Sequence, residues 1–179
     1  HIDHIGAAAQ FEQVYMHEAD ESVFKLHSEW LLEGGEVEIL PTCENMNLFK
    51  TPFTYDLGNR MLTVLHVPGH TSGSICTRDE KYKQLYTGDT CCKADVLLNL
   101  EFSESLETYN EAMKSLKKDT EDMITTWPGH HANPVGTEIM DEFLEAAELL
   151  LSGKECGEEK NHSHGPAKYF QWKNVGIWY

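Results

Sequence analysis

The sequence predicts a mixed α/β (α+β) domain, and three observations support that fold class. Short β-rich stretches alternate along the 179 residues with segments of helical periodicity. Hydrophobic residues make up 40% of the chain, which is enough for a packed core. Gly, Pro and Asp follow the β-rich stretches, as expected where strands end in loops. No segment repeats, so we expect a single domain over residues 1–179.

The first third of the chain combines short apolar runs with one longer helical pattern. We expect a helix start, a strand, a helix and a polar loop, at residues 7–13, 14–17, 18–32 and 45–52 respectively. The helix has an apolar face of Val23, Leu26, Trp30 and Leu31, and Gly34-Gly35 should end it.

The rest of the chain contains further strands and two amphipathic helices. Strands are predicted at residues 61–67, 83–88, 123–128 and 169–179, helices at 103–119 and 136–153, and a loop at 153–168. Ser103 is the expected N-cap of the first helix, and Gly153 should end the second. The apolar stripe of the first helix contains Leu106, Tyr109, Met113 and Leu116.

Charge and cysteine content exclude several classes of protein. The formal net charge is −16, with 30 acidic residues against 14 Lys and Arg, so we expect no nucleic-acid partner. No apolar run is long enough for a membrane span, so we expect no membrane partner. The five cysteines include no C-x-x-C pair, which favours free thiols in the cytoplasm over disulfides or a zinc ribbon.

Four short stretches place histidine or aspartate beside glycine or at a predicted strand end. They are HIDH at 1–4, PGH at 68–70, TGD at 87–89 and PGHH at 128–131. Each follows a predicted strand, or would do so if a strand preceded residue 1. Imidazole and carboxylate together suit zinc, iron or manganese without any thiolate. Their recurrence in order therefore predicts a metal site.

Each stretch alone also has a simpler interpretation. A Gly-His or Gly-Asp pair can be an ordinary turn, and Asp3 and His4 can cap a helix. A terminal His1 could bind copper through its amine and imidazole. His66 is expected to be packed or hydrogen-bonded, and His17 and His27 to be surface or strand-end residues. The pair His162 and His164 is expected in a solvated loop, and the aromatic C-terminus in a core-facing strand.

These motifs resemble those of the metallo-β-lactamase superfamily. HIDHIG is similar to the last two-thirds of its His-x-His-x-Asp-His signature, and PGHTSGS, YTGDT and WPGHH are similar to the motifs that follow. The resemblance implies an αββα metallo-β-lactamase-like sandwich, of which this chain is the C-terminal portion. It also implies an upstream histidine two residues before His1 and preceding strands, so we expect the chain to be truncated at its N-terminus.

The resemblance further implies a pair of divalent metal ions, with zinc expected first and iron or manganese as alternatives. His1 and His70 would bind the first ion together with the upstream histidine. Asp3, His4 and His130 would bind the second, and Asp89 would bridge the two. At residues 130–131 the family pattern Pro-Gly-His favours His130 as the ligand. The residues expected to hydrogen-bond the ligands, or only to form turns, are Thr71, Ser74, Thr90 and His131.

The reaction implied by the resemblance is hydrolysis of a small-molecule substrate. A hydroxide that bridges two metals would cleave a small ester, thioester or lactone, and Asp3 could accept a proton. Asp89 points to the glyoxalase-II-like or lactonase-like branch, because β-lactam-cleaving members generally lack an aspartate ligand there. The basic residues that glyoxalase II uses for glutathione are not recognisable in the C-terminal segment.

Three alternatives stay open at this point. The same ligands support phosphodiester or RNA hydrolysis, although the acidic composition disfavours it. A mononuclear iron dioxygenase of the same fold is the second alternative. The third is a metal-binding protein without turnover.

Overall fold

The protein is described by a computed structural model that covers residues 1–6, 8–33 and 46–179. Its chain contacts divide it into two compact units, residues 1–51 and 52–179, which we describe one at a time. The helix end predicted at Gly34-Gly35 and the thiol of Cys43 lie outside the described residues. The prediction that residues 1–179 form a single domain stays a prediction.

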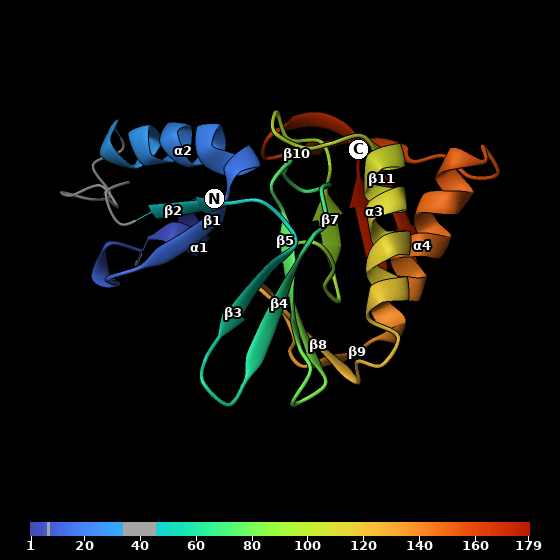
Figure 1. Cartoon of the computed structure of the whole chain (residues 1–179). Coiled ribbons are helices and arrows are strands. Elements are labelled where there is room, and N and C mark those ends of the chain that lie inside the picture. The colour runs from blue at the N-terminus through green and yellow to red at the C-terminus, as the bar shows by residue number, and fades with distance from the viewer. Residues whose placement is uncertain (7, 34–45) are drawn as a thin grey trace. The chain divides into compact units, whose positions relative to one another are not determined.

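The first unit contains short helices and one pair of strands (Figure 1). Its elements are α1 (Ile2–Ile5), η1 (Ala8–Gln10), β1 (Val14–His17), η2 (Glu18–Asp20), α2 (Glu21–Glu33) and β2 (Met46–Phe49). The predicted strand at 14–17 and helix at 18–32 are confirmed, the helix beginning with a 3-10 turn. Val23 and Phe24 are almost fully buried, as expected for the apolar face of α2. Trp30 is 45% exposed, so its predicted place on this face is wrong.

The polar loop predicted at residues 45–52 is wrong, because Met46–Phe49 form strand β2. β2 pairs in parallel with β1, so that Val14 lies opposite Met46 and His17 opposite Phe49. This segment alternates poorly between apolar and polar residues, and pairing with a distant strand overrides its local preference. The helix start predicted at 7–13 is reduced to the 3-10 turn Ala8–Gln10.

The second unit is built on two sheets. Its strands are β3 (Phe53–Asp56), β4 (Met61–His66), β5 (Ile75–Asp79), β6 (Gln84–Gly88), β7 (Asp95–Leu97), β8 (Thr125–Pro128), β9 (Val135–Gly136), β10 (Glu158–His162), β11 (Gly165–Trp172) and β12 (Val175–Trp178). The larger sheet has the order β3-β4-β5-β6-β8-β9, and the smaller one β10-β11-β12-β7. Within the larger sheet only β6 and β8 pair in parallel. The predicted strands at 61–67, 83–88 and 123–128 are thus confirmed as β4, β6 and β8.

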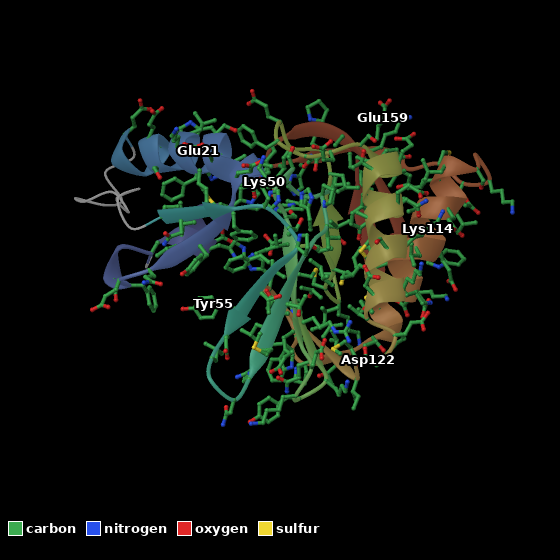
Figure 2. The ribbon with its side chains drawn as sticks, viewed as in Figure 1. Glu21, Lys50, Tyr55, Lys114, Asp122 and Glu159 are labelled. Atoms are coloured by element: carbon green, nitrogen blue, oxygen red, sulfur yellow. The ribbon has the colours of Figure 1, made fainter. Side chains whose placement is uncertain are left out.

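Two amphipathic helices, α3 (Leu106–Asp119) and α4 (Glu138–Leu151), run side by side and supply much of the core of this unit (Figure 1). The core joins helix residues such as Tyr109 and Phe143 to strand residues such as Leu85 and Ile177, all of them buried. The outer faces of the helices are charged, and Lys114 of α3 lies 3.5 Å from Glu148 of α4 (Figure 2). Both predicted helices are confirmed, and Gly153 follows α4 with a positive φ of 69°.

The sequence predicts Ser103 as the N-cap of α3, but the structure shows that Ser105 is the N-cap. The Ser105 hydroxyl accepts a hydrogen bond from the Thr108 amide at 3.2 Å. The Ser103 hydroxyl is instead used outside the helix, where it donates to the backbone carbonyl of His70. The helix therefore begins later than its polar first residues predict.

The loop predicted at residues 153–168 is also wrong, because Glu158–His162 form β10 and Gly165 begins β11. β10 is the edge strand of the smaller sheet, and its first four residues are exposed, so it lacks the alternating apolar pattern of a half-buried strand. The single strand predicted at 169–179 is a hairpin. Lys173, with a φ of 47°, turns the chain between β11 and β12.

The C-terminal aromatic residues partly fulfil the prediction of a core-facing strand. Phe170, Trp172 and Tyr179 pack against the core, whereas the Trp178 indole donates to Asp95 at 2.9 Å. Among the described helices, none combines the length and the apolar character needed to cross a bilayer.

Candidate metal centre

The six predicted metal ligands fall into both units of the chain. His1, Asp3 and His4 lie in the unit of residues 1–51, and His70, Asp89 and His130 lie in the unit of residues 52–179. Each group is therefore considered by itself.

In the second unit, the three predicted ligands follow the ends of three strands that point the same way. His70 follows β4, Asp89 follows β6 and His130 follows β8. β4 and β6 both pair antiparallel with β5, and β6 pairs parallel with β8, so the C-terminal ends of all three meet at one edge of the sheet. The sheet topology thus brings together side chains that are distant in sequence.

Asp89 is the central residue of this group. Its Oδ2 lies 3.4 Å from His70 Nε2, and its Oδ1 lies 3.4 Å from His130 Nε2. Each carboxylate oxygen therefore faces a different imidazole. The side chains of His70 and Asp89 are 8% and 17% exposed, whereas that of His130 is 46% exposed, so the group is open to solvent on the His130 side.

The orientation of the His70 ring is fixed by the backbone. His70 Nδ1 lies 2.9 Å from the carbonyl oxygen of Leu97, at the end of β7. Since a carbonyl can only accept, Nδ1 donates its proton, and in the neutral ring the lone pair is then on Nε2. Metal-binding histidines commonly show this arrangement, in which the second ring nitrogen donates to a carbonyl or carboxylate.

Two glycines allow the loops of Asp89 and His130 to approach each other. Gly88 has a φ of 50°, a conformation that favours glycine, and the Gly129 amide donates to the Gly88 carbonyl at 2.9 Å. This bond extends the pairing of β6 and β8 past a register shift between Tyr86 and Gly88. The residues directly before Asp89 and His130 are thereby joined.

Several polar residues next to the ligands take part in turns. Thr71 and Ser74 bond to each other, with the two hydroxyl oxygens 2.9 Å apart and the Thr71 amide donating to Ser74 Oγ. The Thr90 amide donates to the Thr87 carbonyl, and Thr90 is 2% exposed. His131 is exposed and has a φ of 64°. That these four residues support the ligands stays a prediction.

Three of the described cysteines in this unit, Cys76, Cys91 and Cys92, are buried free thiols. Burial raises the pKa of Cys92 to about 11, with further contributions from the charges of Asp89 and Asp95. Burial likewise raises the pKa of Cys76 to about 12 and that of Cys91 well above its ordinary value. These pKa shifts keep the three thiols protonated at neutral pH in the metal-free protein.

In the first unit, the HIDH motif forms a single helical turn. The His4 amide donates to the His1 carbonyl at 3.1 Å, and His4 Nε2 lies 3.6 Å from Asp3 Oδ2. Both side chains are exposed, and the His1 ring stacks on the His27 ring with a centroid distance of 4.8 Å. His27 also contacts Trp30, so it supports His1 and is not an ordinary surface residue.

The other histidines have structural partners. His66 Nε2 lies 2.7 Å from the Ser72 carbonyl, which confirms the expectation of a hydrogen-bonded histidine. His17 ends β1, is 8% exposed and accepts from the Ala19 amide through Nδ1, so it is a strand-end residue but not a surface one. The solvated loop predicted for His162 and His164 is confirmed only for His164, which is exposed in the turn after β10. His162 ends β10, and its ring lies 5.2 Å from the His164 ring and 4.7 Å from the Trp178 ring.

Sequence reasoning missed the residues that support the His70 loop. The Ser103 hydroxyl lies 2.8 Å from the His70 carbonyl and 3.3 Å from the Leu97 carbonyl. The Glu104 amide donates to the Gly69 carbonyl, and the Glu104 carboxylate accepts from the Ser72 hydroxyl. Nothing in the local pattern distinguishes these residues from the start of a helix.

The donor set of the second unit fits a divalent metal ion. It consists of two imidazole nitrogens and one carboxylate, with the buried imidazole held in the tautomer that binds metal through Nε2. A carboxylate that presents its two oxygens to different imidazoles is suited to bridge two ions. The contributions of His1, Asp3 and His4 to such a site stay a prediction.

Comparison with known proteins identifies the family. The family model described as the Metallo-beta-lactamase superfamily matches residues 1–130. Acyl-coenzyme A thioesterase MBLAC2 from Homo sapiens is 25% identical over 161 residues, which cover 77% of this chain and 55% of that protein. Hydroxyacylglutathione hydrolase from Bdellovibrio bacteriovorus is 27% identical over 124 residues, which cover 66% and 40%. The chain spans about half the length of the curated relatives it matches.

A bacterial relative and two solved structures agree with this assignment. The probable polyketide biosynthesis zinc-dependent hydrolase BaeB from Bacillus velezensis is 22% identical over 145 residues, covering 80% of this chain and 59% of BaeB. TTHA1623 in a di-iron-bound form matches with a TM-score of 0.63 at 22% identity, covering 82% of this chain and 70% of that one. A metallo-beta-lactamase from Pontibacter korlensis matches with a TM-score of 0.55 at 18% identity, covering 80% and 61%. The predicted fold class is thus confirmed, and the chain belongs to the metallo-beta-lactamase superfamily.

Proposed function

We propose that this protein is a metal-dependent hydrolase of a small thioester, ester or lactone, with two divalent ions held by His1, Asp3, His4, His70, Asp89 and His130. The observation that supports the proposal most directly is the position of Asp89, whose two oxygens face His70 and His130 at 3.4 Å each. Among the three bond types we place the thioester first, because two relatives are named as a thioesterase and as a hydroxyacylglutathione hydrolase. Zinc is the first choice of metal, since one relative is named as zinc-dependent.

The residues of the chain would divide the work of such a site. Divalent ions, when bound, would lower the pKa of water and polarise the carbonyl group of the substrate. His70 offers Nε2 from a ring that the Leu97 carbonyl orients, so it needs no rearrangement to bind. His130 is the more exposed imidazole and leaves room for substrate on its side. Asp3 would accept the proton that the attacking water loses.

The test combines metal analysis with a substrate panel. Purified protein should contain two zinc ions per chain and hydrolyse thioesters, with esters and lactones as slower substrates. Asp89→Ala should remove most of the metal and the activity, because it deletes the carboxylate between the two imidazoles. Asp119→Ala, an exposed aspartate at the end of α3, is the matched control and should retain both.

Other results would overturn the proposal in different ways. One iron per chain with oxygen uptake would indicate the dioxygenase alternative, and cleavage of phosphodiesters alone would indicate the nuclease alternative. Bound metal without turnover on the whole panel would leave a metal-binding protein. Full metal content in Asp89→Ala would refute the role of Asp89.

A further inference from the structure

The short segment of residues 103–109 contacts two of the three ligand-bearing loops of the second unit. This segment contains the approach to α3 and its first turn. Its residues hydrogen-bond to the backbone of the loop that carries His70 and of the loop that carries Asp89.

On the His70 side, the contacts come from Ser103 and Glu104. The Glu104 amide donates to the Gly69 carbonyl at 2.8 Å, which fixes the residue before His70. Ser103 Oγ lies 2.8 Å from the His70 carbonyl and 3.3 Å from the Leu97 carbonyl. Since Leu97 is also the acceptor for His70 Nδ1, one hydroxyl lies beside both the backbone and the ring partner of this ligand.

On the Asp89 side, the contact comes from Tyr109. Its hydroxyl donates to the Thr90 carbonyl at 3.0 Å, which fixes the residue after Asp89. Burial raises the pKa of Tyr109 well above its ordinary value, so the hydroxyl stays a donor. The same ring lies against Gly69, where an added Cβ would come within 2.5 Å of Tyr109 Cδ2.

The Tyr109 ring cannot easily shift. The residue is fully buried, and its ring meets the Phe143 ring edge-on at a centroid distance of 6.3 Å and an angle of 85°. The ring therefore links α3 to the His70 loop through its contact with Gly69, and to the Asp89 loop through its hydrogen bond to Thr90.

We propose that Ser103 and Tyr109 are positioning residues, which hold the His70 and Asp89 loops at the separation that a shared metal ion requires. This inference rests on the proposed function, because it takes His70 and Asp89 as ligands. Neither residue touches the metal or the substrate in this proposal. Both act through backbone carbonyls beside the ligands.

The test measures metal affinity and folding stability separately. Tyr109→Phe keeps the ring and removes only the hydroxyl, and Ser103→Ala removes the other hydroxyl. Thr120→Val is the matched control, because the buried Thr120 hydroxyl donates to the Leu116 carbonyl at 2.7 Å at the opposite end of α3. All three variants lose one hydroxyl that donates to a backbone carbonyl, so a merely structural role predicts similar effects.

Zinc affinity should fall about 10-fold in Tyr109→Phe and in Ser103→Ala, the lower end of the range seen when supporting groups around a metal are removed. Thr120→Val should bind zinc as the wild type does while losing stability to urea. The visible spectrum of the cobalt(II)-substituted protein should change in the first two variants only. Ser103→Thr, which keeps a hydroxyl, should restore the wild-type affinity.

Two outcomes would overturn the inference, and they are distinguishable. If the wild type binds zinc and both variants bind it equally well with unchanged cobalt spectra, the positioning role is refuted and the proposed function stands. If the wild type binds neither zinc nor cobalt, the ligand assignment fails and the positioning role fails with it.

Discussion

Replacing Gly69 by alanine tests how tightly the His70 loop is packed. The new Cβ would lie 2.5 Å from Tyr109 Cδ2 and 3.3 Å from Tyr109 Cβ and Cγ. The buried ring is held by its hydrogen bond to Thr90 and by Phe143, so the clash must be relieved by moving the loop or the helix. Gly69 lies outside the left-handed region, so its backbone conformation adds no strain for alanine.

The magnitude follows from two opposing terms. Overpacking in a well-packed site costs about 1–3 kcal/mol. Restricting the unfolded chain by replacing glycine stabilises the fold by about 0.4–1 kcal/mol. The free energy of unfolding should therefore fall by about 1–2 kcal/mol. With a urea m-value on the order of 2 kcal/mol/M, the midpoint of unfolding should fall by roughly 0.5–1 M.

Urea unfolding followed by circular dichroism measures this shift. Gly69→Val should be less stable than Gly69→Ala, because it adds two methyl groups next to the same ring. A Gly69→Ala protein as stable as the wild type, or more stable, would refute the reasoning and show that the Tyr109 ring yields.

Three further predictions concern the cap of α3, the buried thiols and a histidine. Ser105→Ala should lower the free energy of unfolding by about 0.5–2 kcal/mol, measured by urea unfolding, since it removes the hydroxyl that accepts from Thr108. Of the four described cysteines, the exposed Cys156 should react with iodoacetamide in the folded protein. The others should react only after unfolding, because burial raises their pKa values, as peptide mapping by mass spectrometry would show; they are Cys76, Cys91 and Cys92. Burial and the charge of His164 lower the pKa of His162, so the unfolded chain takes up this proton more readily and stability falls as pH drops through the ordinary histidine range. His162→Gln should lose less stability over that range, and an identical loss in both proteins would contradict the assignment.

The ligand loops of the second unit could be predicted from sequence because strand ends and glycines mark them. PGH, TGD and PGHH each follow a β-rich stretch, and the structure places all three at one edge of a sheet. Their convergence depends on the parallel pairing of β6 with β8 and on β5 lying between β4 and β6. No local sequence pattern indicates which strands pair, so the sequence predicts the strand ends but not the distances between the ligands.

The errors in the predicted fold arise where tertiary contacts outweigh local preference. β10 was predicted as a loop because an edge strand exposes its polar residues, and β2 because its partner β1 lies far away in the sequence. Serine is a preferred N-cap residue, but the hydroxyl of Ser103 donates to the His70 carbonyl instead. Tyr109 was predicted in the apolar stripe of its helix, and its hydrogen bond to Thr90 depends on a contact that helical periodicity does not show.

The adjacency of β6 and β8 has a consequence for how this protein can vary. Asp89 and His130 follow neighbouring strands that the Gly129–Gly88 bond joins beyond the sheet, so their spacing depends on strand pairing and not on the length of chain between them. Residues 91–124, which include β7 and α3, lead from this edge to the start of β8 at the opposite end of the sheet. Insertions in the exposed connections of this excursion can reshape the surroundings of the site while the aspartate and the histidine keep their separation.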